Sequence, residues 1–149
     1  MIAFYDREKL EGYLNPLRVQ GPEPLDLLTV NGERKSLPMK NVRAIYFVRD
    51  FNGDYEPERK AFLSRPKLEG LWVRLKFRDN ETLEGVVPND LLALLDSGVQ
   101  ITPPDFNGAV PRIFVPREAL SEMTVLGVVG IARRKPAAPL PAQPELFSE

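Results

Sequence analysis

The amino-acid sequence predicts an all-β protein made of two tandem copies of one small barrel unit. The first observation is an internal repeat, because IAFYDREKLEG at residues 2–12 returns as LKFRDNETLEG at residues 75–85. The second is that short segments of alternating apolar and charged residues, bounded by turn residues, recur along the chain. The third is a change to proline-rich and alanine-rich composition in residues 131–149, which predicts a disordered, partly polyproline tail.

The internal similarity continues beyond this first block. Residues 27–31 resemble residues 99–103, and residues 37–48 resemble residues 115–126. Two copies are too few for a solenoid, so they predict paired small domains or one fused pseudo-dimer. The expected organisation is a first repeat at 1–50, a charged connector at 51–67, a second repeat at 68–130 and the tail at 131–149.

The second copy shows the clearest strand pattern. Apolar and charged residues alternate over 73–77, Asp79 and Asn80 form a turn, and the return strand starts at Thr82, which predicts a hairpin. Further strands are expected at 98–102, 112–115 and 123–128. Before the last of these strands, residues 116–122 predict a single helical turn, because proline suits the first position of a helix.

Glycine occupies the same place in both copies. Gly12 and Gly85 each fall within the predicted second strand of their repeat. A residue without a Cβ lets a strongly bent strand approach its neighbour, so both glycines predict a curved sheet.

These elements resemble the Sm-like (LSm) family of small SH3-like barrels. The first motif of that family is followed by VRLKFRDNETLEG at 73–85, and the apolar spacing of its second motif by FVPREALSEM at 114–123. The resemblance implies two tandem SH3-like or Sm-like barrels with short helical turns. Open strands of small barrels favour edge-to-edge pairing, so self-association into an oligomer is also expected.

The same resemblance bears on function. Sm-like proteins bind RNA through a loop and an arginine-glycine pair, and this chain has residues 89–93 and Pro116-Arg117 at those places. A barrel retained as a scaffold predicts a non-catalytic bacterial binding or adaptor protein whose ligand is another protein. The alternative is an RNA-binding Sm-like protein, with Arg74, Lys76 and Arg117 as contacts to RNA phosphates.

Composition limits the class of protein. The chain has 149 residues, of which 43% are hydrophobic and 28% charged, as in ordinary soluble globular proteins. It has no apolar run long enough to span a bilayer and no secretory signal pattern, so a cytoplasmic location without membrane contact is expected. A net charge of −1 argues against broad, non-specific binding to nucleic acid.

Catalysis finds little support in the residue types. The chain has no histidine and no cysteine, which removes the commonest general base, the imidazole metal ligand and thiolate chemistry. The acidic run at 50–58 resembles half a calcium loop, but Tyr55 and Ala61 stand where such a loop needs glycine and glutamate. We therefore expect a protein that is not an enzyme and has no cofactor and no metal.

The tail carries one further motif. Gln143, Leu146 and Phe147 resemble the short Gln-x-x-Leu-Phe peptide by which bacterial replication and repair proteins dock on the sliding clamp. In that resemblance the glutamine is hydrogen-bonded in one small pocket and the two apolar residues fill another. A sliding-clamp-associated protein is therefore the second alternative function, and the other interpretation is that Leu146 and Phe147 fold back on the barrel.

Overall fold

The computed structural model describes residues 2–5, 8–15, 24–51, 59–94, 97–108 and 110–130. These residues form ten β-strands, one short α-helix and two 3-10 helices, so the all-β prediction is confirmed. The predicted tail and residues 52–58 of the predicted connector lie outside the described residues. None of the helices in the described ranges is long and apolar enough to cross a membrane.

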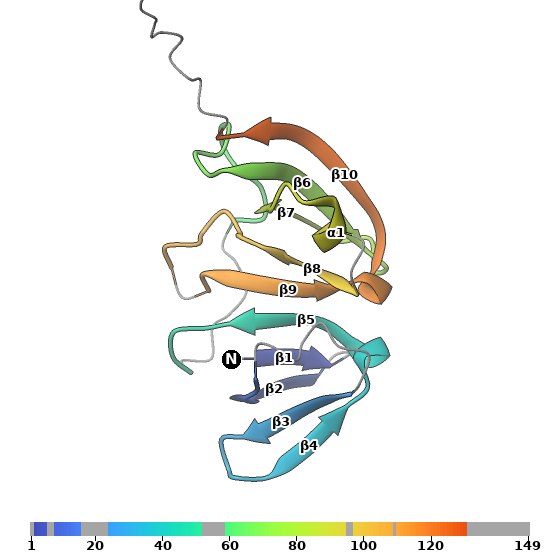
Figure 1. Cartoon of the computed structure of the whole chain (residues 1–149). Coiled ribbons are helices and arrows are strands. Elements are labelled where there is room, and N and C mark those ends of the chain that lie inside the picture. Colours follow the sequence, from blue (N-terminus) through green and yellow to red (C-terminus); the bar gives the residue numbers. More distant parts are fainter. Residues whose placement is uncertain are drawn as a thin grey trace, which may run out of the picture.

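The first repeat is a five-stranded antiparallel arrangement. Its strands lie in the order β4-β3-β2-β1-β5, which Figure 1 shows from the bottom of the molecule to its middle. A 3-10 turn precedes the last strand, as the sequence predicted for the equivalent place in the second copy. The elements are β1 (Ile2–Tyr5), β2 (Glu8–Tyr13), β3 (Leu25–Thr29), β4 (Arg34–Leu37), η2 (Met39–Asn41) and β5 (Val42–Phe47).

The second repeat has the same strand order. The sheet β10-β6-β7 is linked to the β8-β9 pair through a single bridge between Val86 and Thr102, which gives the order β9-β8-β7-β6-β10. When the strands are numbered along each repeat, both repeats therefore have the same spatial order: fourth, third, second, first, fifth. The elements are β6 (Gly70–Phe77), β7 (Thr82–Val87), α1 (Leu91–Leu94), β8 (Gly98–Ile101), β9 (Arg112–Pro116), η3 (Arg117–Ala119) and β10 (Leu120–Val129).

The two fifth strands share a β-bulge at the same position. The register of β5 against β1 shifts so that Arg43 is the extra residue, and the register of β10 against β6 shifts in the same way at Ser121. A bulge adds twist to the strand that carries it. The shared bulge makes the expected equivalence of 42–48 with 120–126 correct in the structure.

Two other predicted matches between residues of the two repeats are wrong. Leu25 pairs with Leu37 as Val99 pairs with Val115, so Leu25 is the counterpart of Val99, two residues before the expected Leu27. In the first hairpin, Ala3 lies opposite Leu10, whereas Leu75 lies opposite Leu83 in the second hairpin. The first hairpin is therefore one residue shorter, which makes Ala3, not Ile2, the counterpart of Leu75.

The repeats are joined by a ladder between β5 and β9, which makes one continuous seven-stranded sheet. One face of this ladder belongs to the core of the first repeat, where Ile45 and Phe47 pack with Phe114 from β9. The other face belongs to the core of the second repeat, where Tyr46 of β5 packs with Ile113. The β5-β9 ladder is thus a wall shared by two cores.

Hydrogen bonds close neither repeat into a barrel within the described residues. In the second repeat only the Val86–Thr102 bridge connects β7 with the strand that follows, and β2 meets β3 through two residue pairs. Part of the edge of β7 pairs with the connector, since the Glu84 N–H donates to the carbonyl of Lys60 at 2.8 Å. The expected small barrels are therefore present as curved, open sheets.

Candidate functional site

The feature that stands out on the surface is a single helical turn, α1, which follows β7. Asp90 precedes it, and the Asp90 carboxylate accepts a hydrogen bond from the Leu92 N–H at 3.0 Å. Aspartate satisfies the free N–H groups at the start of a helix in this way. The Leu94 N–H donates to the Asp90 carbonyl at 3.1 Å and completes the turn. The sequence analysis missed this helix, although aspartate before a leucine pair was the available signal.

Two leucines of α1 face solvent. Leu91 is 74% exposed and Leu92 is 79% exposed, whereas Leu94 on the other side of the turn packs against the core of the second repeat. Isolated exposed leucines are common on protein surfaces, whereas larger contiguous apolar patches indicate interaction sites, which makes this pair a candidate for one.

A cavity of about 240 Å³ lies beside this helix. Its lining is mostly apolar, with the Gln100 amide as its polar side chain. Pockets that hold small-molecule ligands are usually of about 300–1,000 Å³, and a cavity of about 150 Å³ already holds one benzene ring, so this cavity has room for one or two apolar side chains. The lining residues are Val87, Pro88, Ala93, Leu94, Gly98, Val99 and Gln100.

Arg117, one of the predicted RNA contacts, lies next to α1. Its guanidinium donates from Nη2 to the Leu94 carbonyl at 2.6 Å, and its backbone N–H donates to the Ser97 carbonyl at 2.8 Å. A cation at the C-terminal end of a helix satisfies free carbonyl groups there. The structure thus places Arg117 where it fixes the end of α1 against the start of β8.

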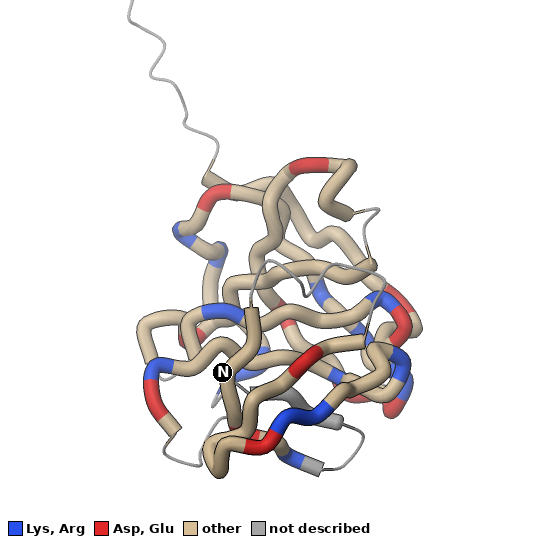
Figure 2. Tube along the Cα trace, turned by 60° about the horizontal axis from the view of Figure 1, so that its bottom comes forward, with Lys and Arg blue, Asp and Glu red and all other residues tan. Residues whose placement is uncertain are grey.

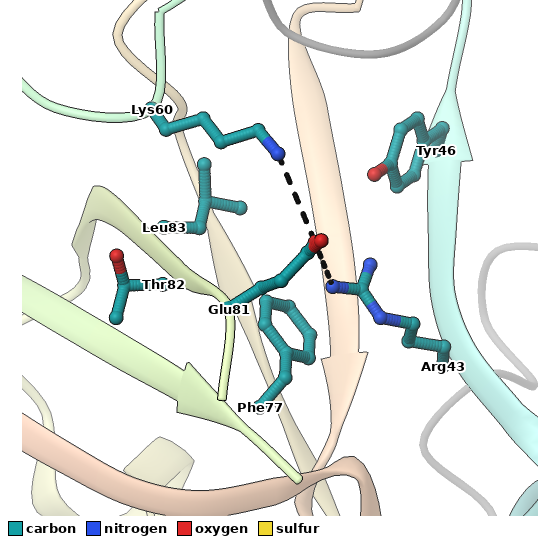
Figure 3. Close-up of a pocket in the computed structure, with 7 residues that line it drawn as sticks. All are labelled: Arg43, Tyr46, Lys60, Phe77, Glu81, Thr82 and Leu83. Carbon is teal, nitrogen blue, oxygen red and sulfur yellow. Dashed lines mark hydrogen bonds and ion pairs between the residues drawn. The ribbon is translucent and has the colours of Figure 1, made fainter. Parts of the chain in front are cut away.

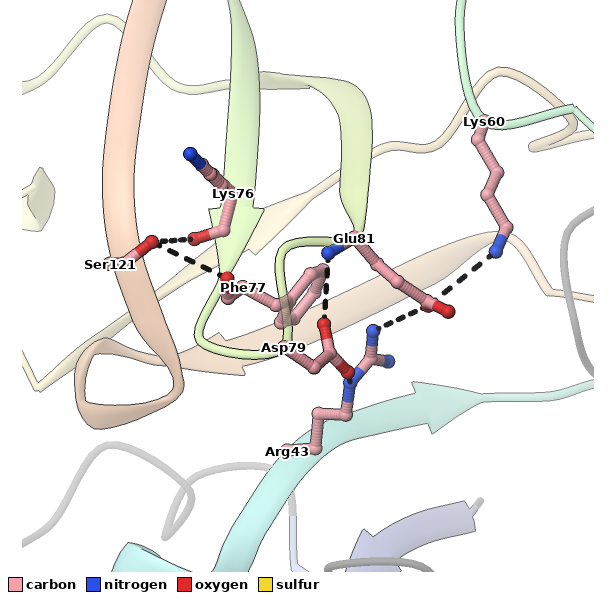
Figure 4. Close-up of polar contacts among 7 residues, drawn as sticks. All are labelled: Arg43, Lys60, Lys76, Phe77, Asp79, Glu81 and Ser121. Carbon is pink, nitrogen blue, oxygen red and sulfur yellow. Dashed lines mark hydrogen bonds and ion pairs between the residues drawn. The ribbon is translucent and has the colours of Figure 1, made fainter.

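The other two predicted contacts lie on β6. The Arg74 guanidinium is 3.5 Å from the buried carboxylate of Glu84, which also accepts hydrogen bonds from the Trp72 indole and the Phe62 N–H. Lys76 is two residues further along the strand, and its carbonyl accepts a hydrogen bond from the Ser121 hydroxyl (Figure 4). Figure 2 shows Lys and Arg interspersed with Asp and Glu along the trace, without a long basic stretch.

A polar cluster joins the repeats at the turn between β6 and β7. The Arg43 guanidinium of β5 contacts the Asp79 carboxylate at 3.1 Å and the Glu81 carboxylate at 3.0 Å, and it lies 4.0 Å above the ring centre of Phe77 (Figures 3 and 4). The pKa of Asp79 lies below its ordinary value because the Glu81 N–H donates to its carboxylate and Arg43 lies beside it.

Two cavities lie beside this cluster, and the one that Arg43, Lys60 and Glu81 line is too small for a ligand. Its volume is about 10 Å³, which is room for one water molecule at most. Arg43 and Lys60 both approach Glu81 across it (Figure 3). The other cavity, of about 310 Å³, is lined by Lys40, Arg43, Arg78 and Asp79 among others. Arg43 and Asp79 are paired with each other at its edge, so we regard the cluster itself as a structural link between the repeats.

No group of three or more acidic side chains with the geometry of a metal site occurs in the described ranges. Gln143, Leu146 and Phe147, the predicted partner peptide, lie outside the described residues. Of the predicted site residues that the structure describes, only Arg117 has a hydrogen bond to α1.

The fold and this surface define a small β-rich protein of two fused repeats with an apolar cavity at one helical turn. The chain belongs to DUF6982, a family of unknown function whose model matches residues 1–127. No curated protein and no solved structure matches the chain.

Proposed function

We propose that this protein is a non-catalytic cytoplasmic binding or adaptor module whose ligand is another protein. The observation that carries the proposal is the pair Leu91 and Leu92, exposed on the helical turn beside an apolar cavity of about 240 Å³. The partner inserts an apolar side chain into this cavity and covers the two leucines. Tandem Sm-like repeats form the scaffold, an assignment supported by their common strand order and by the 3-10 turn before each fifth strand.

Apolar burial supplies the driving force for such a contact. Full burial of one leucine side chain stabilises a complex by about 1.5–3 kcal/mol. Leu91 and Leu92 expose most of their surface in the free protein, so nearly all of this gain remains for a partner. A few anchors of this kind, surrounded by contacts that exclude water, dominate most protein interfaces.

A protein ligand accounts for the surface better than RNA does. Binding of RNA phosphates needs cations that project toward solvent, and a base needs an aromatic or guanidinium plane on which to stack. Arg117 donates instead to a backbone carbonyl, and Arg74 is paired with Glu84. RNA binding and docking on a sliding clamp stay as alternative predictions.

The test compares the partners that two serine variants capture from a bacterial lysate. The double variant Leu91→Ser, Leu92→Ser removes the apolar anchors, and Leu63→Ser is the matched control because Leu63 is 82% exposed in the connector. Both variants should fold, since surface substitutions change stability by only about 0.5 kcal/mol. A photo-crosslinking residue at position 92 should label the same partner directly.

The expected result is a protein retained by the natural chain and by Leu63→Ser but lost by the double variant. Equal capture by all three chains would contradict the proposal. In parallel, fluorescence anisotropy with labelled single-stranded RNA at low and moderate salt tests the alternative. Saturable, salt-sensitive binding that Arg117→Ala weakens would favour RNA as the ligand.

A further inference from the structure

The cavity of about 310 Å³ beside the polar cluster lies between the two repeats, and we call it the inter-repeat cavity. Its walls come from η2 and the start of β5 in the first repeat, and from the β6-β7 turn and η3 in the second. None of its lining residues belongs to the α1 cavity. The two cavities are therefore separate sites on the protein.

Strand pairing brings the walls of this cavity together. Because β5 runs antiparallel to β9, the start of β5, which follows η2, lies beside the end of β9, which precedes η3. Figure 1 shows the two 3-10 turns next to each other, one before β5 and the other before β10. The β6-β7 turn is fixed on a third side, since the Arg78 N–H donates to the Ala119 carbonyl at 3.1 Å. The cavity thus exists only because the repeats are fused.

The inter-repeat cavity has an apolar floor and a charged rim. Val42 is 2% exposed and Phe77 is 3% exposed, so these two lining residues form the floor. Lys40, Arg78 and Glu118 also line the cavity, and all three are exposed. Pockets for small molecules usually begin at about 300 Å³, so this cavity has the size for a small polar ligand.

Two cations of the rim keep an uncompensated charge. Within the part of the chain that the structure describes, neither Lys40 nor Arg78 takes part in an ion pair. The Arg78 Nε donates to the Glu118 carbonyl at 2.5 Å, which orients the guanidinium without cancelling its charge. The two terminal nitrogens then remain for a ligand. A guanidinium fork matches the geometry of a phosphate, and an ammonium group adds a compact second charge.

The charge balance of the rim favours an anion. The Asp79 carboxylate is already paired with the Arg43 guanidinium at 3.1 Å. Without that pair, Lys40 and Arg78 stand against the single carboxylate of Glu118, which leaves one positive charge in excess. Opposite charges at short range attract even in a partly hydrated site.

The carboxylates around the cavity limit the size of this anion. The side chains of Asp79 and Glu81 are 50% and 58% exposed, and Glu118 lies on the rim. A nucleic-acid strand brings a row of phosphates, and the neighbours of the bound phosphate would meet these negative charges. A single phosphate group on a small molecule avoids that repulsion.

We infer that the inter-repeat cavity binds a small phosphate-bearing molecule, with its phosphate group between Lys40 of the first repeat and Arg78 of the second. This site goes beyond the protein-binding function proposed above. Neither repeat alone provides both cations, so the site depends on the fusion of the two copies.

The experiment is a titration of the full chain at low salt, followed by two-dimensional NMR of its backbone amides. The probes are inorganic phosphate, pyrophosphate and a nucleoside monophosphate. We expect saturable shifts of the amide signals of Asn41, Asp79 and Ala119, which surround the cavity. Tighter binding of the nucleoside monophosphate would identify an organic phosphate as the ligand, and equal binding would identify the phosphate group alone.

Charge variants test the two cations in opposite directions. Lys40→Gln and Arg78→Gln should each weaken binding by about tenfold, because a hydrogen bond to a charged group is lost. Glu118→Gln keeps the carbonyl that orients Arg78 and removes the repelling charge, so it should strengthen binding by about threefold. Lys67→Gln makes the same change of net charge at an exposed position of the connector and is the control. The NMR spectrum of each variant also shows whether it is folded.

Three outcomes would overturn the inference. The first is the absence of amide shifts with all three probes up to about 10 mM. The second is binding that Lys40→Gln and Arg78→Gln weaken no more than Lys67→Gln does. The third is a shift of the same amides by single-stranded RNA but not by the small probes. The double serine variant of α1 should bind the probes like the natural chain, which separates this result from the test of the proposed function.

Discussion

Replacing Phe114 with alanine is expected to destabilise both repeats, although the residue belongs to the second repeat. Phe114 is fully buried, and its side chain packs in the core of the first repeat. Large-to-small changes of this kind cost about 3–5 kcal/mol, because the apolar contacts are lost and a cavity remains. Since small proteins are stable by about 5–15 kcal/mol, the variant loses a large part of its stability.

The assay is urea unfolding followed by two signals at once. Trp72 is the single tryptophan of the chain and lies on β6, so its fluorescence reports on the second repeat, while circular dichroism reports on all strands. With a slope of about 2 kcal/mol per molar urea, the midpoint should fall by about 2 M in both signals. Leu63→Ala is the control and should leave the midpoint unchanged, because Leu63 is exposed.

The reasoning would be refuted if the circular dichroism transition moved while the Trp72 transition stayed in place. Such a result would mean that the first repeat unfolds without the second. A loss of less than about 1 kcal/mol would also contradict the buried position of Phe114. A single cooperative transition in the natural chain is the accompanying expectation.

Three further predictions concern the β5-β9 ladder and the polar cluster. Gly98→Ala should lower the urea midpoint, because the added Cβ would meet the Phe114 ring at 2.5 Å and a backbone oxygen at 2.6 Å; an unchanged midpoint would show that β8 can move away. Arg43→Met should cost about 1–2 kcal/mol in the same assay, since it removes two partly exposed ion pairs and a cation–π contact, and Arg49→Met is a control outside this cluster. The pKa of Asp79 is lowered in the folded state, so the ionised carboxylate stabilises the fold above the unfolded pKa of 3.8. This contribution to the free energy of unfolding is lost as the pH falls through the folded pKa. Asp79→Asn should therefore lose less stability than the natural chain between about pH 5 and pH 2, and identical pH profiles would contradict this.

Some elements could be predicted from the sequence because their signals are local. Pro38 and Pro116 mark the starts of both 3-10 turns, and the matching of 42–48 with 120–126 is correct because it begins at these prolines. The third strands were matched two residues out of place. A shift of two keeps every side chain on the same face of the strand, so the apolar pattern cannot distinguish it from the correct match.

The shared wall and the α1 cavity were missed for different reasons. Residues 44–48 and 113–115 are uninterrupted apolar runs, which is the sequence signal of strands buried on both faces. This signal indicates that both faces of each strand are buried, but it does not say which strand of the other repeat lies beside it. The cavity depends on how α1 packs between β7 and β8, and no spacing along the chain encodes that packing.

The shared wall also constrains how this sequence can change. Tyr46 packs in the core of the second repeat, and its neighbours Ile45 and Phe47 pack in the core of the first. Successive residues of one strand must therefore fit the side chains of different halves of the chain. A larger or smaller residue at Phe114 alters the fit of β3 and β4, which lie more than seventy positions earlier in the sequence. The two copies therefore cannot diverge independently, and a change of volume in one half is best tolerated together with a compensating change in the other.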